Sequence, residues 1–145
     1  MYFSVIIPVY NRPQELDELL ACLTNQSFTD FEVVVIEDGS SISSEEIVNQ
    51  YKKVIPISYY VKENGGQGFA RNYAFEKAKG DFFIILDSDA LIETSYLQAV
   101  YDGVKSEKLD LFGGPDKDHP SFTSVQKAIS FAMTSLFTTG GIRGK

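Results

Sequence analysis

Short apolar segments alternate with segments of helical periodicity along most of this chain. The apolar segments, which are typical of buried strands, are residues 3–9, 31–36, 57–61, 81–86 and 109–112. The helical patterns between them cover residues 16–23, 47–51, 69–79 and 94–106. Strands that alternate with helices in this way predict a mostly parallel sheet, because each parallel connection must cross over the sheet. We therefore expect a Rossmann-like, three-layer α/β/α sandwich.

Polar side chains follow three of the predicted strands at the point where each strand ends. The three groups are Pro8 with Tyr10 and Asn11, then Glu37 with Asp38, then Asp87 with Ser88 and Asp89. In open α/β sheets, ligands bind beyond the carboxyl ends of the strands. Because parallel strands end at the same edge of the sheet, we expect these groups to share one binding site.

The two aspartates of the third group, Asp87 and Asp89, follow the apolar segment 82–86. Buried charge is costly unless it is paired or bound to a cation, so these carboxylates indicate that the chain leaves the core into a crevice. In an extended segment their side chains lie on the same side. Two oxygen ligands together suit Mg²⁺ or Mn²⁺ that carries a phosphate. The alternative interpretation is a solvated turn that caps the following helix.

Other residues near the strand ends have two interpretations each. An ionised Asp38 only accepts hydrogen bonds, so it either bonds an imide N–H or ribose hydroxyls, or it forms a local turn. Arg71 either donates to a phosphate or a base carbonyl, or it lies on an exposed helix surface. Tyr10 either stacks on a base or covers the edge of the core. We expect Asn11 to cap the next helix, and Glu37 to support the site from outside it.

Glycines predict two further features of the same region. Gly80 follows the helical pattern 69–79 and is expected to end that helix. The segment 64–68 (NGGQG) precedes the same helix and is rich in glycine. It either brings backbone amides close to an anion at the helix N-terminus or serves as a flexible connection.

Composition excludes several classes of function. The length of 145 residues fits one domain, and 43% of them are hydrophobic, enough for a substantial core. A formal charge of −7, from 13 basic and 20 acidic residues, argues against a nucleic-acid surface. A single cysteine, Cys22, excludes an internal disulfide framework, and a single histidine, His119, argues against a zinc site or a nucleophilic triad. We expect no signal peptide, no membrane span and a cytoplasmic location, with peripheral binding at the inner face of the membrane as an alternative.

Four segments together resemble the donor-binding half of family 2 inverting glycosyltransferases, which have the GT-A fold. They are residues 4–11 (SVIIPVYN), 35–40 (VIEDGS), 68–72 (GFARN) and 86–89 (LDSD), and they stand in the family's order with similar spacing. The resemblance covers residues 2–116 well. It implies transfer of a sugar, with inversion, from a nucleotide diphosphate donor, most often a UDP-sugar. The acceptor hydroxyl would belong to a saccharide or a lipid-linked molecule in polysaccharide biosynthesis.

The resemblance also implies roles for single residues in the half of the site that binds the nucleotide. Pro8 and Tyr10 would border the base. Asp38 would hydrogen-bond the nucleoside, and Arg71 would lie against the nucleotide.

The Asp-Ser-Asp sequence resembles the family's metal-binding DXD motif. Asp87 would face the ribose or the sugar, and Ser88 would belong to the same donor site. Asp89 would be the direct ligand of Mg²⁺ or Mn²⁺, which would neutralise the developing charge of the leaving diphosphate.

Two regions are expected along the chain. Residues 1–116 would form the nucleotide-sugar-binding core, and residues 117–145 an amphipathic helix over 122–137 with a glycine-rich tail. Family members are usually longer, with the general base and the acceptor site in their second half. We therefore expect a donor-binding fragment of weak or no activity. The helix would pack against the sheet, the missing half, a second copy of the chain or a membrane surface.

Two classes other than a transferase share parts of this pattern. A non-catalytic nucleotide-binding α/β interaction module would have the same fold, and metal-dependent binding would distinguish the two. A phospho-acceptor signalling domain is disfavoured, because it needs an acidic pair after the first strand and a lysine after the fifth. Residues 8–10 (PVY) and 113–115 (GGP) supply neither.

Overall fold

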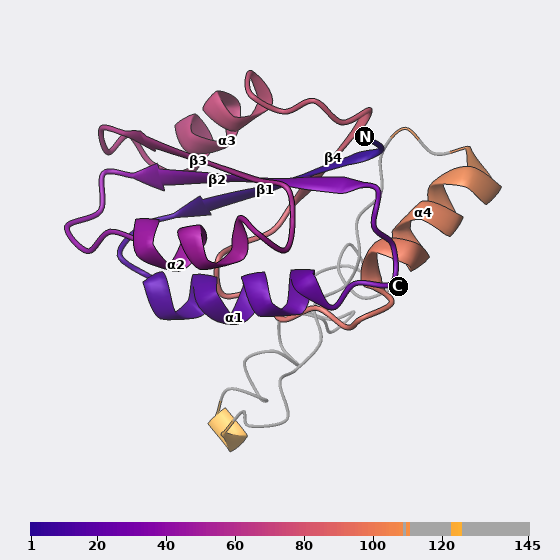
Figure 1. Ribbon diagram of the computed structural model, residues 1–145, viewed down its shortest axis with the longest axis horizontal. Helices are drawn as coiled ribbons and strands as arrows, with labels where there is room; N and C mark the ends of the chain where they lie inside the picture. The colour runs from indigo at the N-terminus through magenta and orange to yellow at the C-terminus, as the bar shows by residue number, and fades with distance from the viewer. Residues whose placement is uncertain (109, 111–122, 126–145) are drawn as a thin grey trace. The chain divides into compact units, whose positions relative to one another are not determined.

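The computed structural model describes residues 1–108, 110 and 123–125. In this part of the chain, parallel strands form a four-stranded sheet in the order β3-β2-β1-β4 (Figure 1). The strands are β1 (Phe3–Val9), β2 (Phe31–Asp38), β3 (Ile57–Lys62) and β4 (Phe82–Ile85). The register places Val9 opposite Glu37, so the residues that follow β1 and β2 emerge side by side. A parallel sheet whose order reverses next to β1 confirms the predicted fold class.

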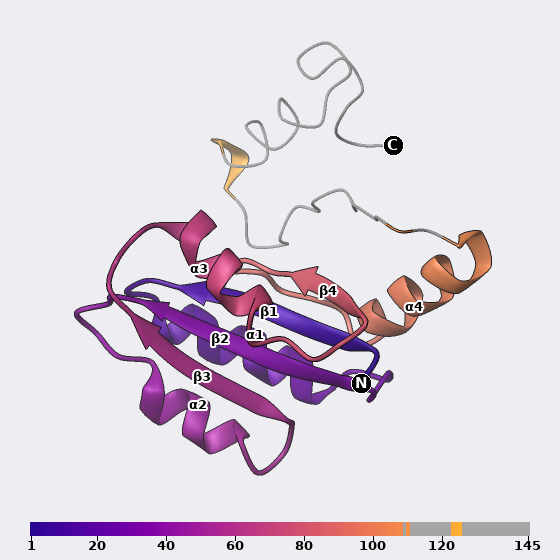
Figure 2. The same cartoon turned by 90° about the horizontal axis from the view of Figure 1, so that it is seen from above.

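Helices lie on both faces of the sheet. They are α1 (Pro13–Thr24), α2 (Glu45–Tyr51) and α3 (Gln67–Phe75), and a further helix, α4 (Tyr96–Glu107), follows β4 in the chain. Figures 1 and 2 show α1 and α2 on one face and α3 on the other. The chain divides into two compact units, Met1–Asp102 and Gly103–Lys145, and the site described below lies within the first. Within the described ranges, none of the helices combines the length and the apolar character that a membrane crossing requires.

Apolar packing explains these layers. All residues of β1 and β2 are buried, as expected for strands that are covered on both faces. The buried leucines of α1 are Leu16, Leu19, Leu20 and Leu23, which share one helix face. On the α3 side the buried cluster consists of Ile6, Val34, Ile36, Ala70 and Ala74. The two alanines are small, so α3 can lie close to the sheet.

The end of α3 differs from the prediction. The helix ends at Phe75 rather than at residue 79, and Gly80 does not terminate it. Instead, the Lys79 amide donates to Glu32 Oε1 at 2.6 Å and the Gly80 amide donates to Ser4 Oγ at 2.8 Å. A Cβ on Gly80 would lie 2.6 Å from backbone atoms of β1. The glycine is therefore required by the close approach of two backbones, which also draws the chain out of the helix.

The segment after β4 is anchored by Gln26, which is buried. Its Nε2 donates to the Glu93 carbonyl at 2.9 Å, and its Oε1 accepts a hydrogen bond from the Leu97 amide at 3.0 Å. The Ser27 amide donates to the Thr94 carbonyl at 2.9 Å. The turn that contains Asp87 and Asp89 lies between β4 and the segment bound by Gln26 and Ser27, so its backbone is held at both ends.

Some predictions fall on residues that the structure does not describe. They concern the strand 109–112 apart from residue 110, His119, the helix 122–137 apart from residues 123–125, and the glycine-rich tail. These stay predictions.

Candidate functional site

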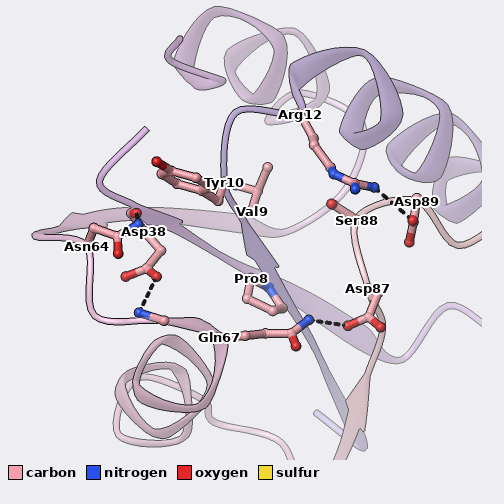
Figure 3. A pocket seen from close by; sticks show the side chains of 11 residues that line it. Pro8, Val9, Tyr10, Arg12, Asp38, Asn64, Gln67, Asp87, Ser88 and Asp89 are labelled. Atoms are coloured by element: carbon pink, nitrogen blue, oxygen red, sulfur yellow. Dashed lines mark hydrogen bonds and ion pairs between the residues drawn. The ribbon is translucent and has the colours of Figure 1, made fainter. Parts of the chain in front are cut away.

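A cleft of about 550 Å³ lies beyond the carboxyl ends of β1, β2 and β4 (Figure 3). Its lining residues are Pro8, Val9, Tyr10, Arg12, Asp38, Asn64, Gly66, Gln67, Asp87, Ser88 and Asp89. In the view of Figure 3, Asp38 and Asn64 lie on one side, Asp87 and Asp89 on the other, and Pro8 of the central strand lies between them. The structure therefore brings side chains of all three predicted groups into one cleft, although Asn11 and Glu37 do not line it.

Asp38, the last residue of β2, is 3% exposed. Lys62 Nζ donates to its Oδ1 at 2.6 Å, the Gly65 amide to Oδ1 at 3.0 Å, and the Gly66 amide to Oδ2 at 2.8 Å. Burial acts to raise the pKa of Asp38, but the Lys62 ammonium and the two amides outweigh it, so the pKa lies below its usual value. A carboxylate has about four acceptor positions, and these three hydrogen bonds leave one of them, on Oδ2, without a bond from these donors.

The partners of Asp38 show how the glycine-rich segment 64–68 is held, whereas its binding of an anion stays a prediction. Asn64 Nδ2 donates to the Asp38 carbonyl at 2.9 Å, in addition to the bonds from Gly65 and Gly66 to the carboxylate. Gly66 has a φ of 92°, a conformation that favours glycine. The segment is therefore held against β2, and it starts α3 at the cleft, where the positive end of the helix dipole lies.

Glu37 supports the site from outside the cleft, as expected. It is buried, its Oε1 accepts a hydrogen bond from the Ser40 hydroxyl, and its Oε2 accepts from the Ser44 amide at 2.8 Å and the Tyr59 hydroxyl at 2.9 Å. Burial, together with the bond to Glu37, raises the pKa of Tyr59 to about 12, so this hydroxyl stays protonated as a donor. Glu37 thus fixes the loop that follows β2.

Asn11 does not cap α1, so that prediction was wrong. The residue at the N-cap position is Arg12, and no side chain caps the helix. Asn11 has a φ of 53°, a conformation that Asn tolerates better than most residues. Its backbone amide donates to Ser40 Oγ at 2.8 Å. Its side-chain Oδ1 accepts hydrogen bonds from the backbone amides of Ser41 at 2.8 Å and Ile42 at 3.1 Å. Asn11 therefore ties the loop after β1 to the loop after β2.

The Asp-Ser-Asp segment forms a turn rather than an extension of β4. The Ala90 amide donates to the Asp87 carbonyl at 3.0 Å. Ser88 is buried, whereas Asp87 and Asp89 are exposed, and all three line the cleft. Both carboxylates therefore reach the same cleft, although the backbone between them is not extended.

Each of the two carboxylates pairs with an arginine. Asp87 Oδ1 accepts hydrogen bonds from Gln67 Nε2 at 2.6 Å and from an Arg71 terminal nitrogen at 2.8 Å. Asp89 Oδ2 accepts from an Arg12 terminal nitrogen at 2.8 Å (Figure 3). Arg71 is not among the residues that line the cleft, but it forms an ion pair with Asp87, which does line it.

Tyr10 is 52% exposed, so it does not cover the edge of the core, and it lines the cleft instead. Two residues that the sequence reasoning did not single out, Arg12 and Lys62, also belong to the site, and so do Asn64 and Gln67 of the glycine-rich segment 64–68, to which no separate role was assigned. Arg12 directly follows the first polar group, which was a usable signal. Lys62 ends β3, Asn64 lies in the loop after it and Gln67 begins α3, and their partners are distant in the sequence.

The carboxylate oxygens in the cleft are ligands that suit a divalent cation which also binds a phosphate. Among the described residues, no group of three or more Asp, Glu, His or Cys side chains could hold a metal ion. In proteins, Mg²⁺ usually takes one or two carboxylates and completes its shell with water and substrate phosphates. Asp87 and Asp89 are exposed carboxylates in one cleft. They fit a cation that arrives with a phosphate.

The four family-like segments all lie within the match to one family model. The family model described as "Glycosyl transferase family 2" matches residues 4–139. The chain belongs to glycosyl transferase family 2. Its sheet order and flanking helices agree with the GT-A fold that the sequence resemblance implied.

Curated relatives of this family 2 chain include two enzymes that act on poly(ribitol-phosphate) by name. The poly(ribitol-phosphate) beta-glucosyltransferase of Bacillus spizizenii is 38% identical over 117 residues, which cover 77% of this chain and 18% of the relative. The beta-N-acetylglucosaminyltransferase TarS of Staphylococcus aureus is 39% identical over 102 residues, which cover 68% of this chain and 18% of the relative. The chain therefore spans less than a fifth of the length of either relative.

Solved structures extend the comparison. Residues 1–349 of S. aureus TarS in complex with UDP-GlcNAc match with a TM-score of 0.78 and 32% identity, covering 85% of this chain and 36% of that one. The mannosyltransferase PcManGT of Pyrobaculum calidifontis, in complex with GDP-Man and Mn²⁺, matches with a TM-score of 0.67 and 24% identity, covering 80% of this chain and 35% of that one. The second likeness concerns the fold alone.

Proposed function

We propose that this chain is the donor-binding part of a metal-dependent glycosyltransferase that moves a sugar from a UDP-sugar to an acceptor hydroxyl with inversion. The observation that carries the proposal is the cleft, since three of the four family-like segments line it and the fourth supplies Arg71 to Asp87. Membership of family 2 and the likeness to TarS, which was crystallised with UDP-GlcNAc, support the same conclusion.

In this proposal, one side of the cleft binds the nucleoside. Pro8 and Tyr10 border the base, and the exposed ring of Tyr10 stacks on it. Asp38 accepts a hydrogen bond from the nucleoside at the remaining position of Oδ2. The Lys62 ammonium keeps Asp38 ionised and therefore keeps it an acceptor.

The opposite side of the cleft binds the diphosphate and the sugar. Asp87, held by Gln67 and Arg71, faces the ribose or the sugar, and Ser88 belongs to the donor pocket beside it. Asp89 is the residue that would hold Mg²⁺ or Mn²⁺. When bound, the cation neutralises the charge that develops on the leaving diphosphate.

The acceptor half of the reaction is assigned to no described residue. A general base must take the proton of the acceptor hydroxyl as it attacks the anomeric carbon. We propose that residues 1–116 are the donor-binding core and that residues 117–145 connect it to the part that binds a saccharide or lipid-linked acceptor.

Calorimetric titration with UDP, with and without Mn²⁺, tests the proposal. We expect binding that requires Mn²⁺ and that Asp89→Asn weakens by at least about tenfold, since it replaces the proposed metal ligand. Asp81→Asn is the matched control, because it makes the same chemical change just before β4, at the end opposite the cleft. UDP binding that ignores both Mn²⁺ and Asp89 would favour a non-catalytic nucleotide-binding module, and the absence of UDP binding would refute both functions.

A further inference from the structure

Arg12 and Asp89 form an exposed ion pair in the cleft (Figure 3). The terminal nitrogen of Arg12 lies 2.8 Å from Asp89 Oδ2, and the two side chains are 51% and 55% exposed. In the described part of the chain, Arg12 is the one side-chain partner of this carboxylate. An ion pair so open to water contributes little to stability, so each partner can exchange the other for a stronger one.

The neighbouring pair differs in this respect. Asp87 accepts hydrogen bonds from both Gln67 and Arg71, and the Arg71 side chain is only 32% exposed. Arg12 instead lies between Asn11, which is hydrogen-bonded to the loop after β2, and the start of α1. Its backbone is therefore held on both sides, while its side chain extends along the cleft. Of the two arginines, Arg12 is the one that can change partner without disturbing buried structure.

The proposed function assigns the cation to Asp89, so Arg12 and the cation compete for one carboxylate. A guanidinium stays protonated and offers only donors, so it cannot coordinate the metal. A cation on Asp89 takes up the charge of the carboxylate and repels the guanidinium bound to Oδ2, so it weakens the pair with Arg12 and favours its release. The released guanidinium then lies in the same cleft as the diphosphate, and arginine forms paired hydrogen bonds with phosphate oxygens.

We propose that Arg12 is a positioning residue that exchanges partners when the donor binds. It pairs with Asp89 in the absence of donor, and it pairs with the diphosphate once a divalent cation occupies Asp89. This inference rests on the proposed function and adds a consequence to it. A cation alone weakens the pair of Arg12 with Asp89 without compensation, whereas a cation with a diphosphate gives Arg12 a new partner. Arg12 therefore makes the cation and the diphosphate bind cooperatively, and the coupling is reciprocal.

The experiment measures Mn²⁺ binding to the full chain, from the electron paramagnetic resonance signal of free Mn²⁺, with and without UDP. Arg12→Gln is compared with Lys53→Gln, an exposed residue after α2 whose loss changes the net charge equally. Arg12→Gln should bind Mn²⁺ alone roughly two- to fivefold more tightly than Lys53→Gln does, because the competitor is gone. At saturating Mn²⁺ it should bind UDP roughly tenfold more weakly, because the diphosphate loses a charged donor.

A second variant, Arg12→Lys, keeps the charge but loses the planar fork, and it serves if Arg12→Gln does not fold by circular dichroism. We expect it to bind UDP with Mn²⁺ roughly threefold more weakly than the unaltered chain. Equal affinities of Arg12→Gln and Lys53→Gln, or of Arg12→Lys and the unaltered chain, would overturn the exchange and leave the proposed function standing. If the unaltered chain does not bind UDP with Mn²⁺ at all, both proposals fall.

Discussion

Lys62→Met removes one of the three hydrogen-bond donors to the buried carboxylate of Asp38. The Lys62 Nζ lies 2.6 Å from Asp38 Oδ1, and the two side chains are 20% and 5% exposed. A hydrogen bond to a charged group contributes about 1.5–3 kcal/mol, and a buried charge that loses its partner keeps its cost of desolvation. The amides of Gly65 and Gly66 remain, and water reaches the position of the ammonium. We therefore expect the free energy of unfolding at pH 7 to fall by about 2 kcal/mol.

The effect of this substitution should depend on pH in a defined direction. The pKa of Asp38 in the folded chain lies below the model-compound value of 3.8. Its ionised form therefore stabilises the fold above about pH 4, and that contribution is lost as the pH falls through the folded-state pKa. Loss of Lys62 raises this pKa. The difference in stability between the unaltered chain and Lys62→Met should therefore shrink as the pH falls below about 4.

Urea denaturation followed by far-UV circular dichroism measures both effects. Lys53→Met, at an exposed lysine, is the control and should change the free energy of unfolding by less than about 0.5 kcal/mol. The same Lys62→Met substitution is also made in an Asp38→Asn background. In that background residue 38 carries no charge, so the loss of Lys62 should destabilise the fold less. An equal loss of stability in both backgrounds would refute the reasoning, because the double-mutant cycle would then show no coupling between the two residues.

Two further substitutions test the parts that support the cleft. Gly80→Ala should lower the free energy of unfolding by about 1–3 kcal/mol, because its Cβ would lie 2.6 Å from the β1 backbone. Gly68→Ala, whose Cβ would meet nothing within 4 Å, should be neutral or stabilising in urea denaturation, and equal effects would contradict the close approach. Glu37→Gln should cost about 2–3 kcal/mol, since a neutral amide oxygen is a weaker acceptor for the Ser44 amide and the Tyr59 hydroxyl, and the amide nitrogen would face the Ser40 hydroxyl that now donates to Glu37. Hydrogen exchange of the Ser44 amide should accelerate in this variant, and unchanged protection would argue against the role of Glu37.

The layered fold was predictable from the sequence because its cause is local. Each strand is a short apolar run and each helix has one apolar face, so the order of elements and the parallel sheet follow from the pattern of residues. The ends of the strands were predictable for the same reason, and with them the meeting of Asp38, Asp87 and Asp89 at one edge. Helix ends and caps were predicted less well. Asn11 and Gly80 carry ordinary cap signals, yet both are used for contacts with segments that are distant in the sequence.

The sequence by itself therefore determined the architecture, the edge of the sheet at which the site lies, and the presence of the Asp87 and Asp89 carboxylates at that edge. Only the tertiary structure decided the partners of these groups: Lys62 and two glycine amides for Asp38, Gln67 and Arg71 for Asp87, and Arg12 for Asp89. The physical reason is that a hydrogen bond or an ion pair depends on distance in space. Periodicity describes which face of an element is buried, but it does not describe which side chain of another element lies within 3 Å of it.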